Sequence, residues 1–236
     1  MFGFHVIYEK SGLSYAKSPL VKFTVKLKKG QTNFVCFVVQ YYGEEHDKME
    51  LVMCIPNKDY QTLKHIAKAY LPGSEEGLAK ALEKYPSAVA GYYINGKLIG
   101  CCFGFASGAT SFTLEGIAII EPYHAQGRGG RLLDFFEKRV RELGFESIGL
   151  GSAGGYVEKF YIKNGYRPTC LKILVEDDLW RRKQDGYPFP VIAEETQGAY
   201  TKLVIGAENY SEMDKDAIED YYLGVESFFV FEKIFE

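Results

Sequence analysis

Three strand-like segments joined by short turns restrict the middle of the chain to antiparallel β-structure. The first covers residues 88–94, the second 97–105 and the third 112–120. Asn95-Gly96 lies between the first two and is a dipeptide that favours a two-residue type I′ hairpin turn. A second turn over residues 106–110 leads into the third segment. We therefore expect a three-stranded antiparallel meander.

A glycine-bearing loop and an amphipathic helix follow the third strand. The loop covers residues 121–130 and contains Gly127, Gly129 and Gly130, and Gly144 is expected to end the helix. The apolar helix positions recur at helical spacing, and they are Leu132, Leu133, Phe136, Val140 and Leu143. Free N–H groups and the positive end of the helix dipole converge at such a helix start, which predicts a phosphate site. The glycine spacing fits neither the dinucleotide-binding fingerprint nor the P-loop.

The glycine loop resembles motif A of the GNAT superfamily of N-acetyltransferases, where Q/R-x-x-G-x-G/A binds the pyrophosphate of acetyl-CoA. His124-Ala125-Gln126-Gly127-Arg128-Gly129 fills the six positions of that motif, with His where Gln or Arg is usual. A second stretch, Phe160 to Pro168, resembles the family's F-Y-x-K-x-G-F-x-P segment at the expected distance downstream. The family's N-x-x-A ahead of it is absent, with Gly154 and Val157 at the matching places. The resemblance covers about residues 50–175.

This resemblance implies four roles for residues of this chain. The loop and the first helical turn would bind the pyrophosphate, through His124, Ala125, Gln126, Gly127, Arg128, Gly129, Gly130 and Arg131. Backbone N–H groups of the preceding strand would bind the thioester carbonyl, at Ile117, Ala118 and Ile119. Glu115 stands where many family members carry a general base that acts through water. Tyr161 matches the tyrosine that protonates the leaving thiolate.

Each of these roles has a purely structural alternative. His124 could bond to the loop backbone, Glu115 could be a solvent-facing strand residue, and Tyr161 could belong to the core. Arg128 and Arg131 could reach phosphate oxygens of the donor or could be solvated side chains on the helix. The sequence alone leaves these alternatives open.

Further strands and helices are expected on both sides of this stretch. Residues 21–28 alternate apolar and polar side chains and are expected to form a hairpin with residues 33–42. Two helices, up to about Tyr70 and Lys84, are predicted to begin at the N-caps Asn57 and Ser74. The later elements are expected to be a strand, a helix and a strand, followed in the tail by another strand, helix and strand: residues 147–150, 156–164, 169–175, 201–205, 214–222 and 227–234.

The element order and the resemblance together imply an α+β fold of the α/β GNAT type. It consists of a mixed, mainly antiparallel twisted sheet flanked by helices. We expect a β-rich N-terminal extension over residues 1–48, an acyltransferase core over 49–175, and a C-terminal strand-helix-strand over 176–236 that completes or extends the sheet. The β-rich start and the aromatic run Phe228 to Phe231 suggest surface that a partner buries, so a homodimer is expected.

Charge and composition exclude several classes of protein. Lys and Arg number 28 against 31 Asp and Glu, a net charge of −3, so the chain lacks the positive field that gathers nucleic acid or anionic lipid. The longest apolar run, Phe34 to Val39, is far shorter than a membrane-spanning helix, and the start does not resemble a secretory signal. The five cysteines include no C-x-x-C pair and no partner His at metal-ligand spacing. We expect a cytoplasmic protein with reduced thiols and no metal.

The function implied by the resemblance is acetyl-CoA-dependent N-acetylation. The acetyl group would move to a primary amine of a small molecule or peptide by direct attack on the thioester, with acetyl-CoA as co-substrate. Two alternatives remain open: a non-catalytic acyl-CoA-binding sensor or interaction module, and a transferase of the same fold that uses another acyl donor.

Overall fold

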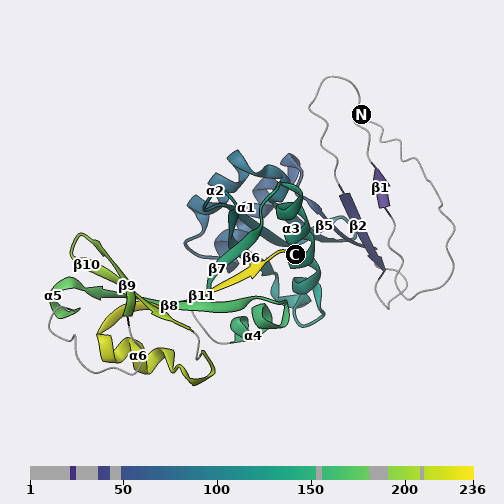
Figure 1. Ribbon diagram of the computed structural model, residues 1–236. Coiled ribbons are helices and arrows are strands. Elements are labelled where there is room, and N and C mark those ends of the chain that lie inside the picture. Colours follow the sequence, from purple (N-terminus) through teal and green to yellow (C-terminus); the bar gives the residue numbers. More distant parts are fainter. Residues whose placement is uncertain (1–21, 25–36, 43–48, 153–155, 181–190, 208–209) are drawn as a thin grey trace. The chain divides into compact units, whose positions relative to one another are not determined.

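The computed structural model (Figure 1) describes residues 22–24, 37–42, 49–152, 156–180, 191–207 and 210–236. The chain divides into two compact units, unit 1 over residues 1–145 and unit 2 over residues 146–236. Within each unit the strands pair antiparallel, and helices flank the sheet. The fold is therefore of the predicted α+β class with a mainly antiparallel open sheet.

Six antiparallel strands form the sheet of unit 1, in chain order. They are β1 (Lys22–Thr24), β2 (Phe37–Tyr42), β3 (Met49–Cys54), β4 (Ala90–Ile94), β5 (Lys97–Ala106) and β6 (Ser111–Ile119). Asn95 and Gly96 have φ values of 50° and 79°, the left-handed pair that a type I′ turn requires. The predicted meander is confirmed. β1 and β2 form the predicted N-terminal hairpin, of which residues 25–36 lie outside the described residues.

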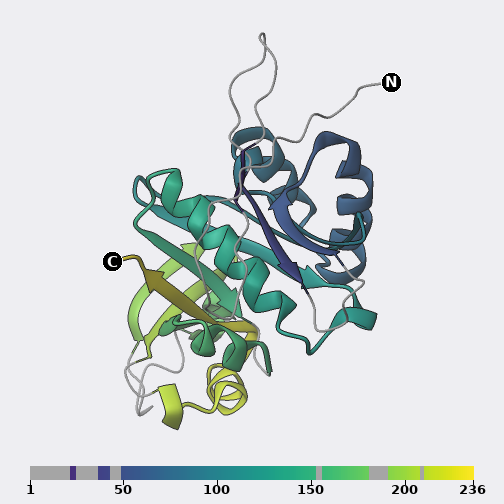
Figure 2. The same ribbon diagram turned by 90° about the vertical axis from the view of Figure 1, so that its right-hand side faces the viewer.

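Helices cover both faces of this sheet (Figures 1 and 2). They are α1 (Tyr60–Tyr70), α2 (Glu75–Lys84) and α3 (Arg128–Glu142), with 3₁₀ turns at Asn57–Asp59, Pro86–Ala88 and Glu121–Tyr123. α1 and α2 share a buried cluster with Tyr93 and Cys101, whereas α3 packs Phe136 against Phe112, with ring centroids 5.9 Å apart. Because side chains alternate along a strand, Cys101 and the equally buried Cys102 face opposite layers.

Several local predictions in unit 1 are wrong. Asn57 opens a 3₁₀ turn, and the N-cap of α1 is Asp59 instead. Ser74 is the N-cap residue of α2, as predicted, but its side chain makes no cap hydrogen bond. The Ser74 hydroxyl instead donates to the Leu71 carbonyl at 2.7 Å. At the end of α3, Leu143 is 40% exposed although it was expected in the core. Leu143 follows the last helical turn, so the helical periodicity no longer directs its side chain inward.

In unit 2 the last strand of the chain is inserted between two earlier strands and pairs antiparallel with both. Its elements are β7 (Ser147–Ser152), α4 (Tyr156–Lys163), β8 (Arg167–Glu176), α5 (Asp177–Trp180), β9 (Val191–Gln197), β10 (Tyr200–Gly206), a 3₁₀ turn (Tyr210–Glu212), α6 (Lys215–Tyr222) and β11 (Gly224–Ile234). The strand order is β7-β11-β8-β10-β9. β7 and β8 both pair antiparallel with β11 and so run parallel to each other, with α4 as the crossover.

The aromatic run in β11 belongs to the core of unit 2. Phe229 and Phe231 are buried, and both pack edge-on against Tyr210, with ring centroids 4.9 and 5.8 Å away. Phe231 also lies 6.4 Å from the ring of Tyr161. The chain itself therefore covers Phe229 and Phe231, whereas Phe228 and Val230 are only half-buried. The homodimer stays a prediction.

Candidate active site

The predicted phosphate loop bends through two residues in the left-handed region of backbone conformation. Ala125 has φ 58° and Gly127 has φ 72°, and α3 begins directly afterwards at Arg128. The helix therefore starts earlier than expected, so that Gly129 and Gly130 lie in its first turn. The N–H groups of a first turn have no acceptor within their own helix. Together with the helix dipole, such groups form the kind of positive site at a helix start that can bind a phosphate.

His124 is tied to the strand that precedes the loop. Its ring nitrogen Nε2 donates a hydrogen bond to the Ile119 carbonyl, and the rest of the side chain is exposed. This bond closes the 3₁₀ turn between β6 and the loop. The contact is of the backbone-bonding kind that the sequence left open as an alternative for His124.

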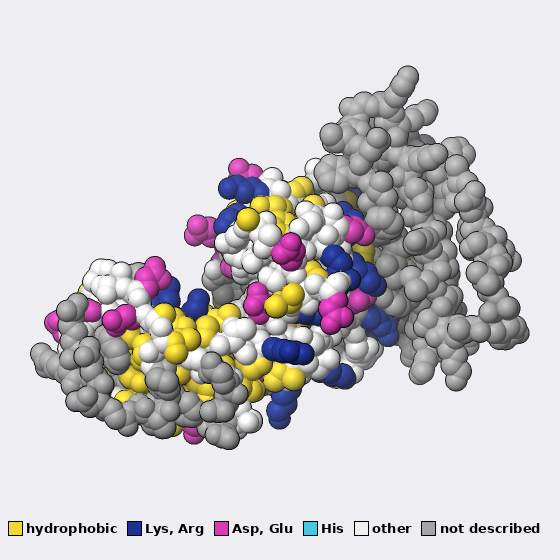
Figure 3. Space-filling view, viewed as in Figure 1, with side chains coloured by type: hydrophobic (Ala, Val, Ile, Leu, Met, Phe, Trp, Pro, Cys, Tyr) yellow, Lys and Arg dark blue, Asp and Glu magenta, His cyan; other side chains and the backbone are white. Residues whose placement is uncertain are grey.

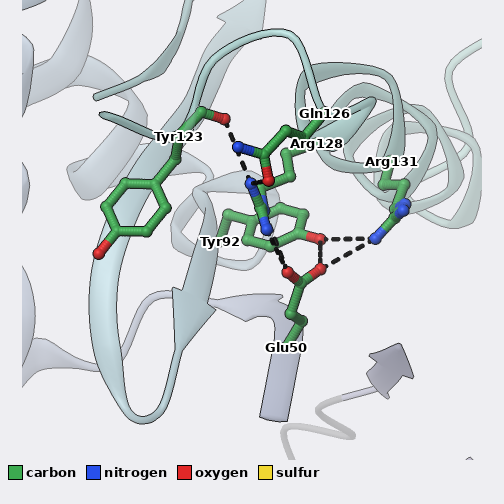
Figure 4. A network of polar contacts seen from close by, with 6 residues as sticks. All are labelled: Glu50, Tyr92, Tyr123, Gln126, Arg128 and Arg131. Atoms are coloured by element: carbon green, nitrogen blue, oxygen red, sulfur yellow. Dashed lines mark hydrogen bonds and ion pairs between the residues drawn. The ribbon is translucent and has the colours of Figure 1, made fainter. Parts of the chain in front are cut away.

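The side chain of Arg128 turns inward, beneath the loop, to a buried carboxylate (Figure 4). Arg128 Nε and Nη2 both donate to Oε1 of Glu50 on β3, at 3.1 and 2.5 Å. Its Nη1 donates to the Gln126 side-chain oxygen and, at 3.4 Å, to the Tyr123 carbonyl. Arg128 thus joins two loop residues to strand β3. Its guanidinium is largely buried, with 10% of the side chain exposed.

Tyr92 and Arg131 complete this network around Glu50. The Tyr92 hydroxyl, on β4, donates to Glu50 Oε2 at 2.6 Å, and Arg131 Nη1 donates to the same Oε2 at 2.9 Å and to the Tyr92 oxygen at 3.0 Å. Burial alone would raise the pKa of Glu50, but the bonds from Tyr92 and Arg128 and the charges of Arg128 and Arg131 outweigh it and lower the pKa. Glu50 is therefore ionised at neutral pH, and two cations against one anion leave the network net positive beside the loop.

Glu50 and Tyr92 are site residues that sequence reasoning missed. Glu50 precedes the apolar run 51–55, and no motif marks it. Its partner Arg128 lies 78 positions further along the chain. The one available signal was a carboxylate within a strand that is otherwise apolar, because a buried charge requires a partner.

Glu115 lies on a β-bulge of β6. Phe103 pairs with Gly116 and Gly104 with Leu114, so Glu115 has no opposite residue on β5. Its side chain lies against Gly77 of α2, where an added Cβ would stand 2.5 Å from the Glu115 carboxyl group. Burial raises the pKa of Glu115, Lys80 opposes the rise and Glu76 adds to it. The carboxylate is thus half-buried and a stronger base than an exposed glutamate.

The backbone of residues 117–119 alternates between the two edges of β6. The Ile120 N–H donates to the Ile99 carbonyl of β5 at 2.8 Å. Because amide direction alternates along a strand, the N–H of Ala118 also points to β5, whereas those of Ile117 and Ile119 point to the opposite edge. Ile117 and Ile119 are accordingly the two of the three predicted positions whose amides are directed away from β5.

Tyr161 lies in unit 2, on α4. It is 7% exposed and packs edge-on against Phe160 and Tyr166, with ring centroids 5.3 and 5.7 Å away. α4 ends before Gly165, whose φ of 87° lies in the left-handed region typical of a helix stop. Gly154, at a position where the family motif departs, lies outside the described residues.

The remaining surface features do not suggest another kind of site in unit 1. Acidic and basic side chains are interspersed on the face of unit 1 seen in Figure 3. In the part of the chain that the structure describes, no group of three or more His, Cys, Asp or Glu side chains could hold a metal ion. No helix among the described elements is long and apolar enough to cross a bilayer.

Comparisons with known proteins give one family and several distant structures. Ard1 from Thermoplasma volcanium is 18% identical, with a TM-score of 0.47, and the match covers 67% of this chain and 99% of that one. Naa50 of Arabidopsis thaliana, in complex with a bisubstrate analogue, is 17% identical, with a TM-score of 0.45 and coverage of 66% and 97%. A GNAT family acetyltransferase from Elizabethkingia anophelis with acetyl-CoA bound is 13% identical, with a TM-score of 0.43 and coverage of 85% and 98%.

The family match rests on sequence and spans the elements just described. Comparison with curated proteins gave no match. The sequence profile of the acetyltransferase (GNAT) family matches residues 51–167, from β3 through the loop and α4 to the start of β8. The chain carries an acetyltransferase domain over these residues and belongs to the GNAT family.

Proposed function

We propose that the protein transfers the acetyl group of acetyl-CoA to a primary amine of a small molecule or peptide. The observation that carries this proposal is the loop between β6 and α3. Two left-handed residues, Ala125 and Gly127, lead there into a helix whose first turn has free N–H groups. The family match over residues 51–167 supports a pyrophosphate of the acetyl donor as the anion that this loop would bind.

Donor binding would use the backbone of the loop more than its side chains. The amides from Gln126 to Gly130 would donate to the pyrophosphate, which the helix dipole also stabilises. Arg131 retains 37% exposure of its side chain and can approach a phosphate, whereas Arg128 is engaged by Glu50 and would act through its amide and by holding the loop. His124 would fix the loop to β6 through its bond to Ile119.

The general base proposed for the acceptor is Glu115. A lysine-like amine with a pKa near 10.4 is neutral in only about one molecule in 10³ at pH 7, a deficit of roughly 4–5 kcal/mol. A base that removes the ammonium proton through water offsets part of this deficit. Glu115 suits the task because burial raises its pKa above that of an exposed carboxylate.

Two further groups would act on the thioester. The outward amides of Ile117 and Ile119 are the candidates to donate to its carbonyl oxygen, where negative charge develops during attack. Tyr161 would protonate the leaving thiolate, a role that rests on its place in the motif Phe160 to Pro168. Because a thiol has a pKa near 8.5, protonation at pH 7 is worth only about 2 kcal/mol, so the acid matters less than the base.

The test is release of free thiol from acetyl-CoA in the presence of a panel of small amines and amino-terminal peptides. We expect thiol release that depends on one class of amine and is lost with Glu115→Gln. Binding of acetyl-CoA without thiol release for any amine would replace the proposal by that of an acyl-CoA sensor. Release with propionyl-CoA or a longer thioester but not with acetyl-CoA would change the donor.

A further inference from the structure

A cavity of about 530 Å³ lies in unit 2, outside the residues assigned to acetyl transfer. Most of its wall comes from residues 210–216, which connect β10 to α6, and the rest comes from Glu158 on α4 and Phe229 on β11. α6 packs against β11 and β8 (Figure 1). The volume lies within the range of pockets that hold small organic molecules.

Glu158 is a buried carboxylate with unused capacity to accept hydrogen bonds. It is 9% exposed, and its Oε2 accepts from the hydroxyl of Tyr210, which also lines the cavity. Its Oε1 is buried and has no hydrogen-bond partner among the described residues. Leaving a buried carboxylate oxygen unpaired costs free energy, which a donor from a bound ligand would offset.

The charges around the cavity favour a cation. Its wall carries three carboxylates, on Glu158, Asp214 and Asp216, against one ammonium, on Lys215. That ammonium is already occupied, because Lys215 Nζ lies 2.9 Å from Asp216 Oδ1 and donates to Ser227 Oγ at 3.2 Å. The surplus of negative charge therefore remains.

The apolar part of the wall favours an organic cation over a metal ion. Phe229 and Tyr210 form an edge-on aromatic pair with centroids 4.9 Å apart, and Met213 lines the same cavity. Aromatic rings and a thioether attract an apolar body and, across a ring face, an ammonium group. Metal ions prefer several oxygen ligands in one place, and the described residues do not provide such a group.

We propose that this cavity binds a small organic ammonium ion with an apolar body, with the ammonium group paired to Glu158. The Tyr210 hydroxyl holds the carboxylate in place, and the apolar part of the ligand lies against Phe229 and Met213. A nitrogen bound in this way stays protonated, because a neighbouring carboxylate stabilises the charged form. It is therefore not the nitrogen that attacks a thioester, and binding here is separate from acyl transfer.

The experiment is a calorimetric titration of the full chain with phenethylammonium chloride, without acetyl-CoA. The matched uncharged probe is 2-phenylethanol, which keeps the ring and replaces the ammonium by a hydroxyl. We expect saturable binding of the ammonium, at least 10-fold weaker binding of the alcohol, and at least a 10-fold loss of ammonium affinity in Glu158→Gln. Glu226→Gln, which removes an exposed carboxylate of β11 outside the cavity, should bind as the wild type does.

Three outcomes would overturn the proposal: no binding of phenethylammonium, equal affinity for the two probes, or equal affinity of Glu158→Gln and the wild type. If Glu158→Gln does not fold, the comparison of the two probes on the wild type decides alone. Because no acyl transfer is measured, these outcomes are independent of the acetyltransferase activity, whose failure would appear only in the thiol assay.

Discussion

Replacing Glu50 by glutamine removes the negative charge on which both arginines of the loop converge. The Glu50 side chain is 3% exposed and that of Arg128 is 10% exposed, so this pair is buried, whereas the pair with Arg131, at 37%, is partly screened by solvent. Removing one partner of a buried pair costs about 3–5 kcal/mol. The glutamine oxygen still accepts one bond, so we expect the lower end, about 3 kcal/mol of unfolding free energy.

Urea unfolding followed by circular dichroism measures this effect as a shift of the midpoint. Glu142→Gln is the matched control. It removes a 45% exposed carboxylate that pairs with Arg139 on α3, and it should lower the unfolding free energy by less than about 1 kcal/mol. The lowered pKa of Glu50 also predicts that the unfolding free energy depends on pH. The contribution of ionised Glu50 to the unfolding free energy is present above the ordinary glutamate pKa of 4.5 and is lost as the pH falls through the lower pKa of the folded state. This pH dependence is expected in the wild type but not in Glu50→Gln. Equal midpoints for Glu50→Gln and Glu142→Gln at pH 7 would refute the reasoning.

The other predictions concern the loop and the proposed catalytic groups. Gly127→Ala meets no atom within 4 Å but must adopt φ near 72°, so we expect a loss of about 1–2 kcal/mol in stability and weaker binding of CoA by calorimetry; unchanged values for both would contradict the left-handed loop. Gly77→Ala should displace the Glu115 carboxyl group and lower kcat without a loss of helix stability, whereas full activity would place the base elsewhere. Since the pKa of Glu115 is raised, activity should fall on acidification at a pH above that of an ordinary carboxylate, and a profile that falls only at the pH of an exposed glutamate would argue against this role. Tyr161→Phe should lower kcat by about 10- to 10³-fold with a smaller effect on donor affinity, and unchanged turnover would remove Tyr161 from the mechanism.

Features set by neighbouring residues were predictable from the sequence. Asn95-Gly96 determines its own turn type, and the strand-loop-helix segment around Gly127 is specified by periodicity and glycine spacing within about thirty residues. The N-cap prediction at Asn57 failed, whereas Ser74 does stand at the N-cap of α2 without making the expected bond. A side-chain hydroxyl has more than one possible hydrogen-bond partner within reach, so the sequence does not fix which bond it makes. Ser74 is an example, since its hydroxyl turned to the Leu71 carbonyl.

Features that depend on distant residues were not predictable. Glu50 meets Arg128 only after the sheet has brought β3 and the start of α3 together, and no local pattern indicates this contact. β9 was missed because it carries Glu194, Glu195 and Thr196 in succession and therefore lacks the apolar alternation of a half-buried strand. It lies at the edge of the sheet of unit 2, where both faces of a strand can remain polar.

A crystal grown with CoA tests the central claim most directly. We predict that the diphosphate lies within hydrogen-bond distance of the amides between Gln126 and Gly130, at the start of α3, with the Arg128 side chain still bonded to Glu50. A diphosphate bound elsewhere, with these amides facing only solvent, would contradict the account.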